Sequence, residues 1–106
     1  MSSMTRHHHF IDNRRVPSVS GETLPVIDPS DGQVFAEIAR GGAAESDQAV
    51  AAARRAADGA WGRMPGVERG RILARACTLI QQHADELMQL ESRDCGKPLT
   101  QARNDV

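Results

Sequence analysis

The stretch DPSDGQVFAEIA, residues 28–39, decides the expected fold because it joins a strong turn signal to a strand pattern. Pro29 presets φ, the aspartate side chains bond nearby backbone groups, and Gly32 permits a positive φ. Apolar residues then recur at every second position, which is the period of a β-strand. We therefore predict a turn followed by a strand over residues 33–39, QVFAEIA.

The residues before this turn indicate a hairpin. Two short alternating runs, Phe10–Val16 and Glu22–Ile27, flank the turn-forming stretch PSVSG at residues 17–21. Pro29 lacks a backbone N–H and would end the second strand. We predict that the two runs are strands paired with each other.

After Glu45 the apolar residues recur at steps of three and four, which predicts helices. Ser46 is the expected N-cap of the first helix. A second helix should begin near Pro65, and a third should end at Gly96, where Pro98 enforces the break before LTQARNDV starts a fourth. The apolar stripes of the first two helices are Val50, Ala53, Ala57 and Trp61, and then Ile72, Ala76, Leu79, Ile80 and His83.

The apolar residues are mostly small. The 106 residues are 40% hydrophobic but only 3% aromatic, and many of them are alanines, which bury little area. We therefore expect a thin core and apolar faces that need a partner surface absent from this chain.

Charge and hydropathy exclude several classes of partner. The net charge is −1, with acidic and basic residues interleaved, so we expect no nucleic-acid partner. No apolar run approaches the roughly 20 residues that span a bilayer, so we expect no membrane segment. Residues 1–9, MSSMTRHHH, lack the apolar core of a secretory signal, which favours a disordered tail and a cytoplasmic protein. Their three adjacent histidines project in different directions and cannot close a tetrahedral metal site alone.

Neither cysteine has the surroundings of a nucleophile. Cys95 falls in the last turn of a predicted helix, where backbone carbonyls disfavour a thiolate. Cys77 shares an apolar side with Leu73 and Ile80, which favours a small core residue. The two cysteines fit no zinc spacing, and a disulfide would conflict with a cytoplasmic location.

Asp94 lies at the negative end of the same helix, so a positive group should compensate its carboxylate. Lys97 or Arg93 could form an ion pair with it, and a bound cation would serve as well. From the residues alone an ion pair is favoured, because surface pairing is the common case. The sequence contains no G-x-G-x-x-G or P-loop pattern that would cradle a nucleotide phosphate.

Taken in order, these segments closely resemble the N-terminal portion of NAD(P)-dependent aldehyde dehydrogenases. The match covers nearly everything in Phe10–Val106. Its most specific pieces are the Asp28-Pro29…Gly32 turn, Trp61 followed by Pro65, Glu68-Arg69 with Leu73, and Glu91…Asp94-x-Gly96-Lys97-Pro98. The chain departs from the family at Cys95, where most members have Thr, and the family's nucleophilic cysteine belongs to a later segment.

The resemblance implies an α/β fold, with an N-terminal β-hairpin and a strand followed by packed helices. Residues 10–106 would be the opening part of a Rossmann-like cofactor-binding domain, incomplete as a domain, after a tail over residues 1–9. The implied activity is oxidation of an aldehyde to a carboxylic acid with NAD or NADP, through a cysteine thiohemiacetal. The catalytic cysteine, glutamate and asparagine and the cofactor-binding residues would all lie beyond Val106, so the 106-residue chain alone should be inactive. Family members usually form homodimers or homotetramers.

The resemblance also implies a structural cation. Some family members resemble one another in a monovalent-cation site, built from backbone carbonyls at the end of the second strand and from the aspartate before Thr-Gly-Lys. Those positions match Val26, Ile27 and Asp94 here, and the ion would be K⁺ or Na⁺, which as hard cations prefer oxygen ligands. An ion pair at Asp94 remains the alternative.

Two other functions stay open. The chain could be a truncated, non-catalytic fragment that acts only as a packing or interaction module on full-length subunits. It could also be a self-standing small helical module, which would unfold cooperatively.

Overall fold

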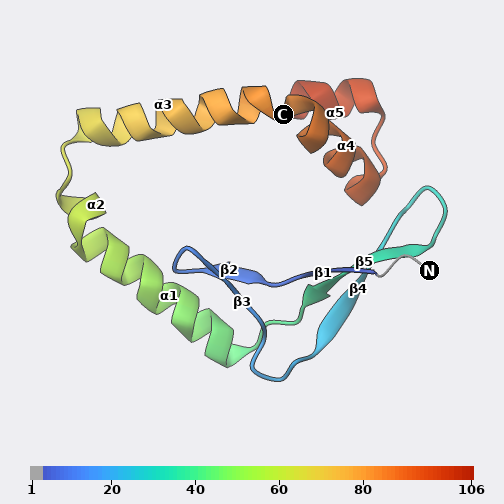
Figure 1. The fold of residues 1–106 in the computed structure, drawn as a ribbon, viewed down its shortest axis with the longest axis horizontal. Coiled ribbons are helices and arrows are strands. Elements are labelled where there is room, and N and C mark those ends of the chain that lie inside the picture. Colours follow the sequence, from blue (N-terminus) through green and yellow to red (C-terminus); the bar gives the residue numbers. More distant parts are fainter. Residues whose placement is uncertain (1–3) are drawn as a thin grey trace. The chain divides into compact units, whose positions relative to one another are not determined.

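The computed structural model describes residues 4–106. Strands come first along the chain and helices follow (Figure 1). The strands are β1 (Thr5–His7), β2 (His9–Ile11), β3 (Arg14–Val16), β4 (Thr23–Ile27) and β5 (Val34–Ala39). The helices are α1 (Ala43–Asp58), α2 (Ala60–Arg63), α3 (Gly66–Gln82), α4 (Ala84–Cys95) and α5 (Leu99–Asp105). This mixed α/β composition confirms the expected fold class.

The strands form two small sheets. The first has the order β1-β5-β4, in which β1 runs parallel to β5. Backbone hydrogen bonds from Asp28 N to Gln33 O at 2.8 Å and from Arg40 N to Glu22 O at 2.9 Å flank β4 and β5, so these two strands are antiparallel. The second sheet is the antiparallel pair β2–β3.

The hairpin predicted between residues 10–16 and 22–27 is wrong. The first run instead folds back on itself as the β2–β3 hairpin, whose turn residues Asp12 and Asn13 have φ of 55° and 60°. Aspartate and asparagine tolerate the left-handed region better than most side chains and therefore suit a two-residue hairpin turn. The partner of β4 is β5, joined to it by the predicted turn, in which Gly32 has φ of 72°.

The disordered tail predicted for residues 1–9 is wrong where the structure describes it. Residues 5–7 form β1 and His9 begins β2, whereas residues 1–3 lie outside the described residues. Backbone hydrogen bonds hold β1 on β5, and these do not depend on apolar side chains. The polar sequence of β1 therefore carried no strand signal.

The predicted helices are confirmed, with changes at their ends. Proline precedes α3 and α5, and α4 ends at Gly96 in the left-handed conformation, with φ of 78°. The N-cap of α1 is Gly42 rather than the predicted Ser46, because the carboxylate of Glu45 accepts the Gly42 N–H. The short α2 was not predicted. Within residues 4–106 no helix combines the length and apolar character that crossing a bilayer requires.

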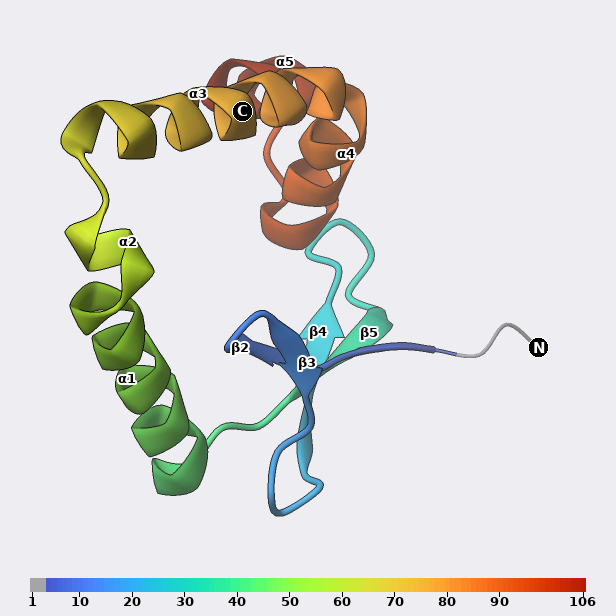
Figure 2. The same ribbon diagram turned by 60° about the vertical axis from the view of Figure 1, so that its left-hand side comes forward.

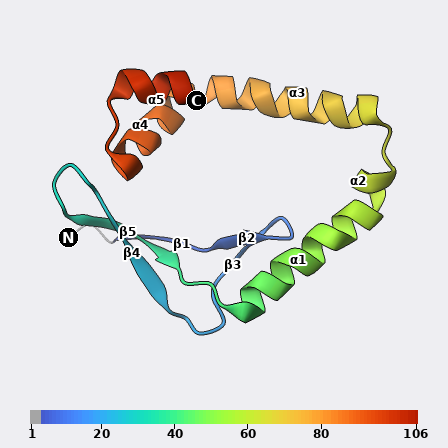
Figure 3. The same cartoon turned by 180° about the vertical axis from the view of Figure 1, so that it is seen from behind.

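The chain divides into two compact units. One comprises the residues up to Val26 together with Val34–Arg63, and it contains the β2–β3 hairpin, β5, α1 and α2. The other comprises Ile27–Gln33 and Met64–Val106, and it contains the turn before β5 together with α3, α4 and α5. Within the first unit β2 contacts α1 (Figure 3), and within the second α4 contacts α5 (Figure 2).

The core is thin, as the composition predicts. The buried apolar residues of the described chain are Ala36, Met88 and Ala102, two of them alanines. The accessible surface is 8316 Å², whereas two separate compact proteins of half this mass would together expose about 7,000 Å². Large apolar side chains stay exposed on α3 and α4, namely Val67, Leu73, Leu79, Ile80 and Leu90.

Candidate functional site

Both cysteines lie on helix surfaces. Cys95 Sγ, in the last turn of α4, is 3.0 Å from the carbonyl oxygen of Glu91 and donates its proton to it. This hydrogen bond holds the thiol against the surface of its own helix, which fits the structural interpretation of Cys95. Cys77 is exposed, so the prediction of a core residue is wrong, because α3 has no buried residue.

Lys97 joins the helices on either side of the corner at Gly96. Its Nζ lies 2.9 Å from Glu91 Oε1 on α4 and 2.6 Å from Asp105 Oδ2 on α5. The hydrogen bonds to Asp105 and then to Glu91 raise the pKa of Lys97, and the same lysine lowers the pKa of Glu91. Ser92 Oγ donates to the Lys97 carbonyl oxygen at 2.8 Å. The ammonium group therefore ties α4 to α5.

The ion pair predicted between Asp94 and either Lys97 or Arg93 is wrong. Lys97 is held by two other carboxylates, and Arg93 Nε lies 3.6 Å from Asp28 Oδ2. Neighbouring residues on a helix point in different directions, so Arg93 and Asp94 do not face each other. Asp94 is exposed, and in the described part of the chain it has no ion pair with a cationic side chain.

The cation site at Val26, Ile27 and Asp94 stays a prediction. Val26 is half-buried and Ile27 is exposed. Among residues 4–106, no three His, Cys, Asp or Glu side chains come together as a metal site. A cation at these positions would therefore depend on backbone carbonyl oxygens together with the single carboxylate of Asp94.

The turn before β5 packs against the end of α4. Asp28 accepts hydrogen bonds from the hydroxyl and the backbone N–H of Ser30, at 2.6 and 2.9 Å, and these bonds together with Arg93 hold the pKa of Asp28 below its usual value. Pro29 lies so close to Gly96 that a Cβ on the glycine would stand 2.9 Å from Pro29 Cγ. An open pocket of about 460 Å³ lies between this turn and α4. The motifs DPSDG and DCGKP, separate in the sequence, thus form one structural site.

Glu45 is a site residue that the sequence analysis missed. Its side chain is buried, Oε2 accepts the Gly42 N–H at 2.8 Å, and Oε1 accepts the Val19 N–H. The bonds from Val19 and then from Gly42 hold the pKa of Glu45 below its usual value. Beside this cluster, His9 Nε2 is buried without a hydrogen-bond partner among the described residues. A glutamate three residues after an N-cap is half of a capping box, and that signal could have identified Glu45.

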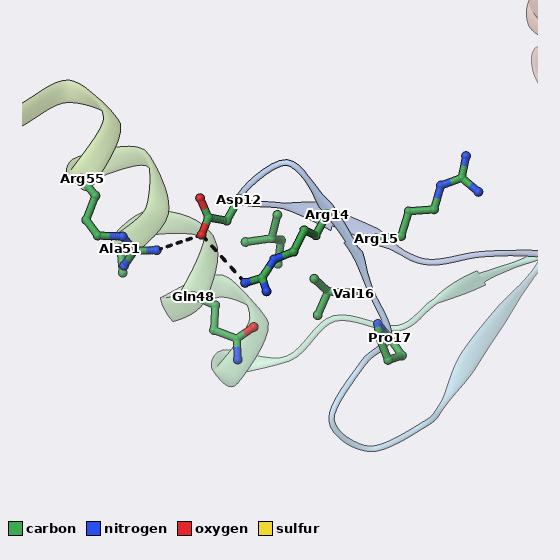
Figure 4. Close-up of a pocket in the computed structure, with 9 residues that line it drawn as sticks. Asp12, Arg14, Arg15, Val16, Pro17, Gln48, Ala51 and Arg55 are labelled. Carbon is green, nitrogen blue, oxygen red and sulfur yellow. Dashed lines mark ion pairs between the residues drawn. The ribbon is translucent and has the colours of Figure 1, made fainter. Parts of the chain in front are cut away.

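An open pocket of about 480 Å³ lies between the β2–β3 hairpin and α1 (Figure 4). Asp12 Oδ2 is 3.9 Å from Arg14 Nη2 and 3.6 Å from Arg55 Nη2. Gln48 of α1 also lines this pocket, whereas the side chain of Arg15 points away from α1 (Figure 4). The other lining residues are Ile11, Val16, Pro17 and Ala51. Sequence analysis did not find this group because only the fold brings the hairpin to α1.

The starts of α1 and α3 do not fit the phosphates of a dinucleotide cofactor. Nucleotide phosphates bind where free N–H groups of a helix start or of a glycine-rich loop point at them. At α1 the Gly42 N–H already bonds the Glu45 carboxylate, whose charge would repel a phosphate. The first turn of α3 likewise carries an acidic residue, Glu68. Neither helix start therefore offers a contact for a dinucleotide phosphate.

Known sequences match most of the chain. Residues 16–106 match the model of the aldehyde dehydrogenase family. Among curated relatives, the mitochondrial benzaldehyde dehydrogenase of Antirrhinum majus is 45% identical over 93 residues, which are 87% of this chain and 17% of that protein. The 2-hydroxymuconic semialdehyde dehydrogenase of Pseudomonas sp. (strain CF600) is 44% identical, over 85% of this chain and 18% of that protein.

A solved structure shares the fold. The NAD-dependent aldehyde dehydrogenase from Sinorhizobium meliloti has a TM-score of 0.90 at 36% identity, and the match covers 97% of this chain and 21% of that one. The chain thus spans about a fifth of the length of the proteins that it matches. By sequence and by fold, it belongs to the aldehyde dehydrogenase family and corresponds to an N-terminal portion of such a protein.

Proposed function

We propose that the complete protein oxidises an aldehyde to a carboxylic acid with NAD⁺ or NADP⁺, through a thiohemiacetal on a cysteine outside residues 1–106. The observation that carries this proposal is the family match over residues 16–106. Relatives named for benzaldehyde and for NAD dependence support an aldehyde substrate and a nicotinamide cofactor. We propose a cytoplasmic location and a homodimer or homotetramer as its assembly.

The part played by residues 4–106 in this activity is structural. Cys95 Sγ donates to a carbonyl oxygen of its own helix, and Lys97 is held by two carboxylates, so neither group is poised to attack a carbonyl carbon. The packing of the DPSDG turn on α4 instead fixes one corner of the scaffold.

An activity assay tests the proposal directly. Residues 1–106 and the product of the whole reading frame are mixed separately with an aldehyde and NAD⁺ or NADP⁺, and reduced cofactor is followed by absorbance. We expect turnover from the longer product alone, and we expect Cys95→Ser in that product to keep at least half of its activity. Turnover by residues 1–106, or loss of all activity in Cys95→Ser, would overturn the assignment.

A second candidate function is a non-catalytic interaction module. The observation that favours it is the exposed apolar set of α3 and α4, with Val67 65%, Leu73 57% and Leu79 56% exposed. In this case residues 1–106 should bind an aldehyde dehydrogenase that lacks its own N-terminal portion. Leu79→Glu should weaken binding at least tenfold, whereas Thr78→Glu, the same change one position earlier, should not. Equal effects of the two substitutions would remove this candidate.

We further propose a structural K⁺ or Na⁺ bound by the carbonyl oxygens of Val26 and Ile27 and by the Asp94 carboxylate. The absence of an ion pair at Asp94 within residues 4–106 supports it, because the carboxylate is free of a competing cationic side chain. Carbonyl ¹³C signals of the two strand residues should shift saturably with KCl and not with choline chloride. The shift should vanish in Asp94→Asn and persist in Asp47→Asn. A shift that survives in Asp94→Asn would contradict the site.

A further inference from the structure

The pocket between the β2–β3 hairpin and α1 carries more positive than negative charge. Arg14 comes from the hairpin and Arg55 from α1, and both guanidinium groups face a single carboxylate, that of Asp12 (Figure 4). The two arginine side chains are 76% and 65% exposed, so a ligand from solution can reach them. Two cations therefore share one anion at the mouth of this pocket.

The two guanidinium groups retain hydrogen-bonding capacity. Charge-assisted bonds between arginine and carboxylate are about 2.7–2.9 Å long, whereas Asp12 lies 3.9 and 3.6 Å away. A guanidinium group has five N–H donors, which this one distant carboxylate does not satisfy. Gln48 stands two helical turns before Arg55 on the same face of α1 and adds a neutral donor to the pocket.

We propose that this pocket binds a phosphate-type oxyanion. Guanidinium groups pair with phosphate oxygens through parallel N–H donors. A tetrahedral dianion presents oxygens in several directions and can bridge Arg14 and Arg55, which approach from different elements. The planar carboxylate of Asp12, fixed at the hairpin turn, reaches neither arginine at bonding distance. The phosphate is either free or esterified, and both forms offer the same oxygens. This site goes beyond the proposed function, which assigns no ligand to these residues.

Arginine Nε–H signals in ¹⁵N NMR spectra of the chain test the site. At constant ionic strength, inorganic phosphate should shift the signals of Arg14 and Arg55 together and saturably, whereas chloride should not. Glycerol 3-phosphate in a parallel titration distinguishes an esterified from a free ligand, and acetate tests a carboxylate. Shifts that follow ionic strength alone, or acetate binding as tight as that of phosphate, would overturn the proposal.

Matched arginine variants separate a defined site from diffuse charge. Arg55→Gln should weaken phosphate binding at least fivefold, whereas Arg54→Gln, the same charge loss outside the pocket lining, should change it less than twofold. If α1 is no longer helical in Arg55→Gln, the variant Arg55→Lys is measured in its place. Lysine keeps the positive charge but lacks the paired N–H donors of arginine. Equal weakening by the substitutions at positions 54 and 55 would overturn the proposal.

A third variant changes the charge in the opposite sense. Asp12→Asn removes the competing carboxylate and should tighten phosphate binding by up to about fivefold, which follows from the ordinary strength of one exposed charge interaction. Asparagine tolerates the φ of 55° at this position, so the hairpin turn should persist. Unchanged or weaker binding in Asp12→Asn would contradict the site.

Discussion

Glu45 joins the start of α1 to the loop that carries Val19 through one carboxylate. Its lowered pKa means that the folded chain favours the charged form more than the unfolded chain does. The resulting stabilisation is complete above the usual glutamate pKa of 4.5 and is lost as the pH falls through the lower value of the folded state.

We predict that Glu45→Gln lowers the hydrogen-exchange protection of the Val19 and Gly42 amides at neutral pH, because it replaces two charged acceptors by one neutral oxygen. In the wild-type chain both amides should lose protection as the pH falls below 4.5. Glu68→Gln, an exposed change in the first turn of α3, is the control and should leave these amides unchanged. Equal protection in Glu45→Gln and the wild type would contradict this role.

Gly96 and Gly32 form a matched pair for testing close packing. Both have a positive φ, 78° and 72°, so alanine should cost about 1–2 kcal/mol of backbone strain at either position. A Cβ at Gly96 would also meet Pro29, whereas at Gly32 no atom lies within 4 Å. Gly96→Ala should therefore lower the opening free energy of α4, measured by hydrogen exchange, more than Gly32→Ala does. Equal losses would show that Pro29 does not constrain the corner.

At the scale of elements, the α4–α5 corner depends on Lys97. Lys97→Met removes the contacts to Glu91 and Asp105, so we expect faster hydrogen exchange at Ala102, whose amide donates to the carbonyl oxygen of Pro98, the N-cap of α5. Arg103→Met is the control, because its contact with Asp85 is long at 3.9 Å and both side chains are highly exposed. If the Ala102 amide exchanges at the same rate in both variants, the contacts of Lys97 do not stabilise α5.

Elements set by local chemistry could be predicted from the sequence. The turn at Gly32, the end of α4 at Gly96 and the strand over residues 33–39 each follow from residue types within a few positions. Proline immediately precedes α3 and α5, and it marks both helix starts because its fixed φ suits the beginning of a helix.

Pairings between distant segments could not be predicted. Strand β1 lies on β5 through backbone hydrogen bonds and the ion pair between Arg6 Nη2 and Glu37 Oε2 at 3.0 Å. An arginine in a short polar segment carries little information on which distant acidic residue it will pair with. The hairpin turn at Asp12-Asn13 was not predicted, because residues 17–21 contain more turn-forming residues and favour a turn there instead. The partners of Lys97 and Arg93 depend on where α5 and the DPSDG turn lie, which a helix pattern does not specify.

At the scale of the whole molecule, the thin core has a measurable consequence. With Ala36, Met88 and Ala102 as its buried apolar residues, the described chain leaves most apolar side chains in water. We predict that residues 1–106 bind the dye anilinonaphthalene sulfonate in native buffer and unfold over a broad temperature range.

Two variants check the source of this dye binding. Leu79→Gln should reduce it, because that side chain is 56% exposed on α3, whereas Gln81→Ala on the same helix should not. A sharp two-state transition without dye binding would instead support a self-standing helical module and contradict the need for a partner surface.

The second compact unit combines Ile27–Gln33 with Met64–Val106, so it can form only after the later stretch has been translated. Asp28 and Arg93, which contact each other, are 65 positions apart (93 minus 28). At about 5–20 residues per second, the ribosome needs about 3–13 s to make the intervening chain. Through that interval the DPSDG turn has no α4 to meet. The first unit can therefore complete its pairings while the nascent chain is still growing, whereas the second must wait for its last helices to emerge.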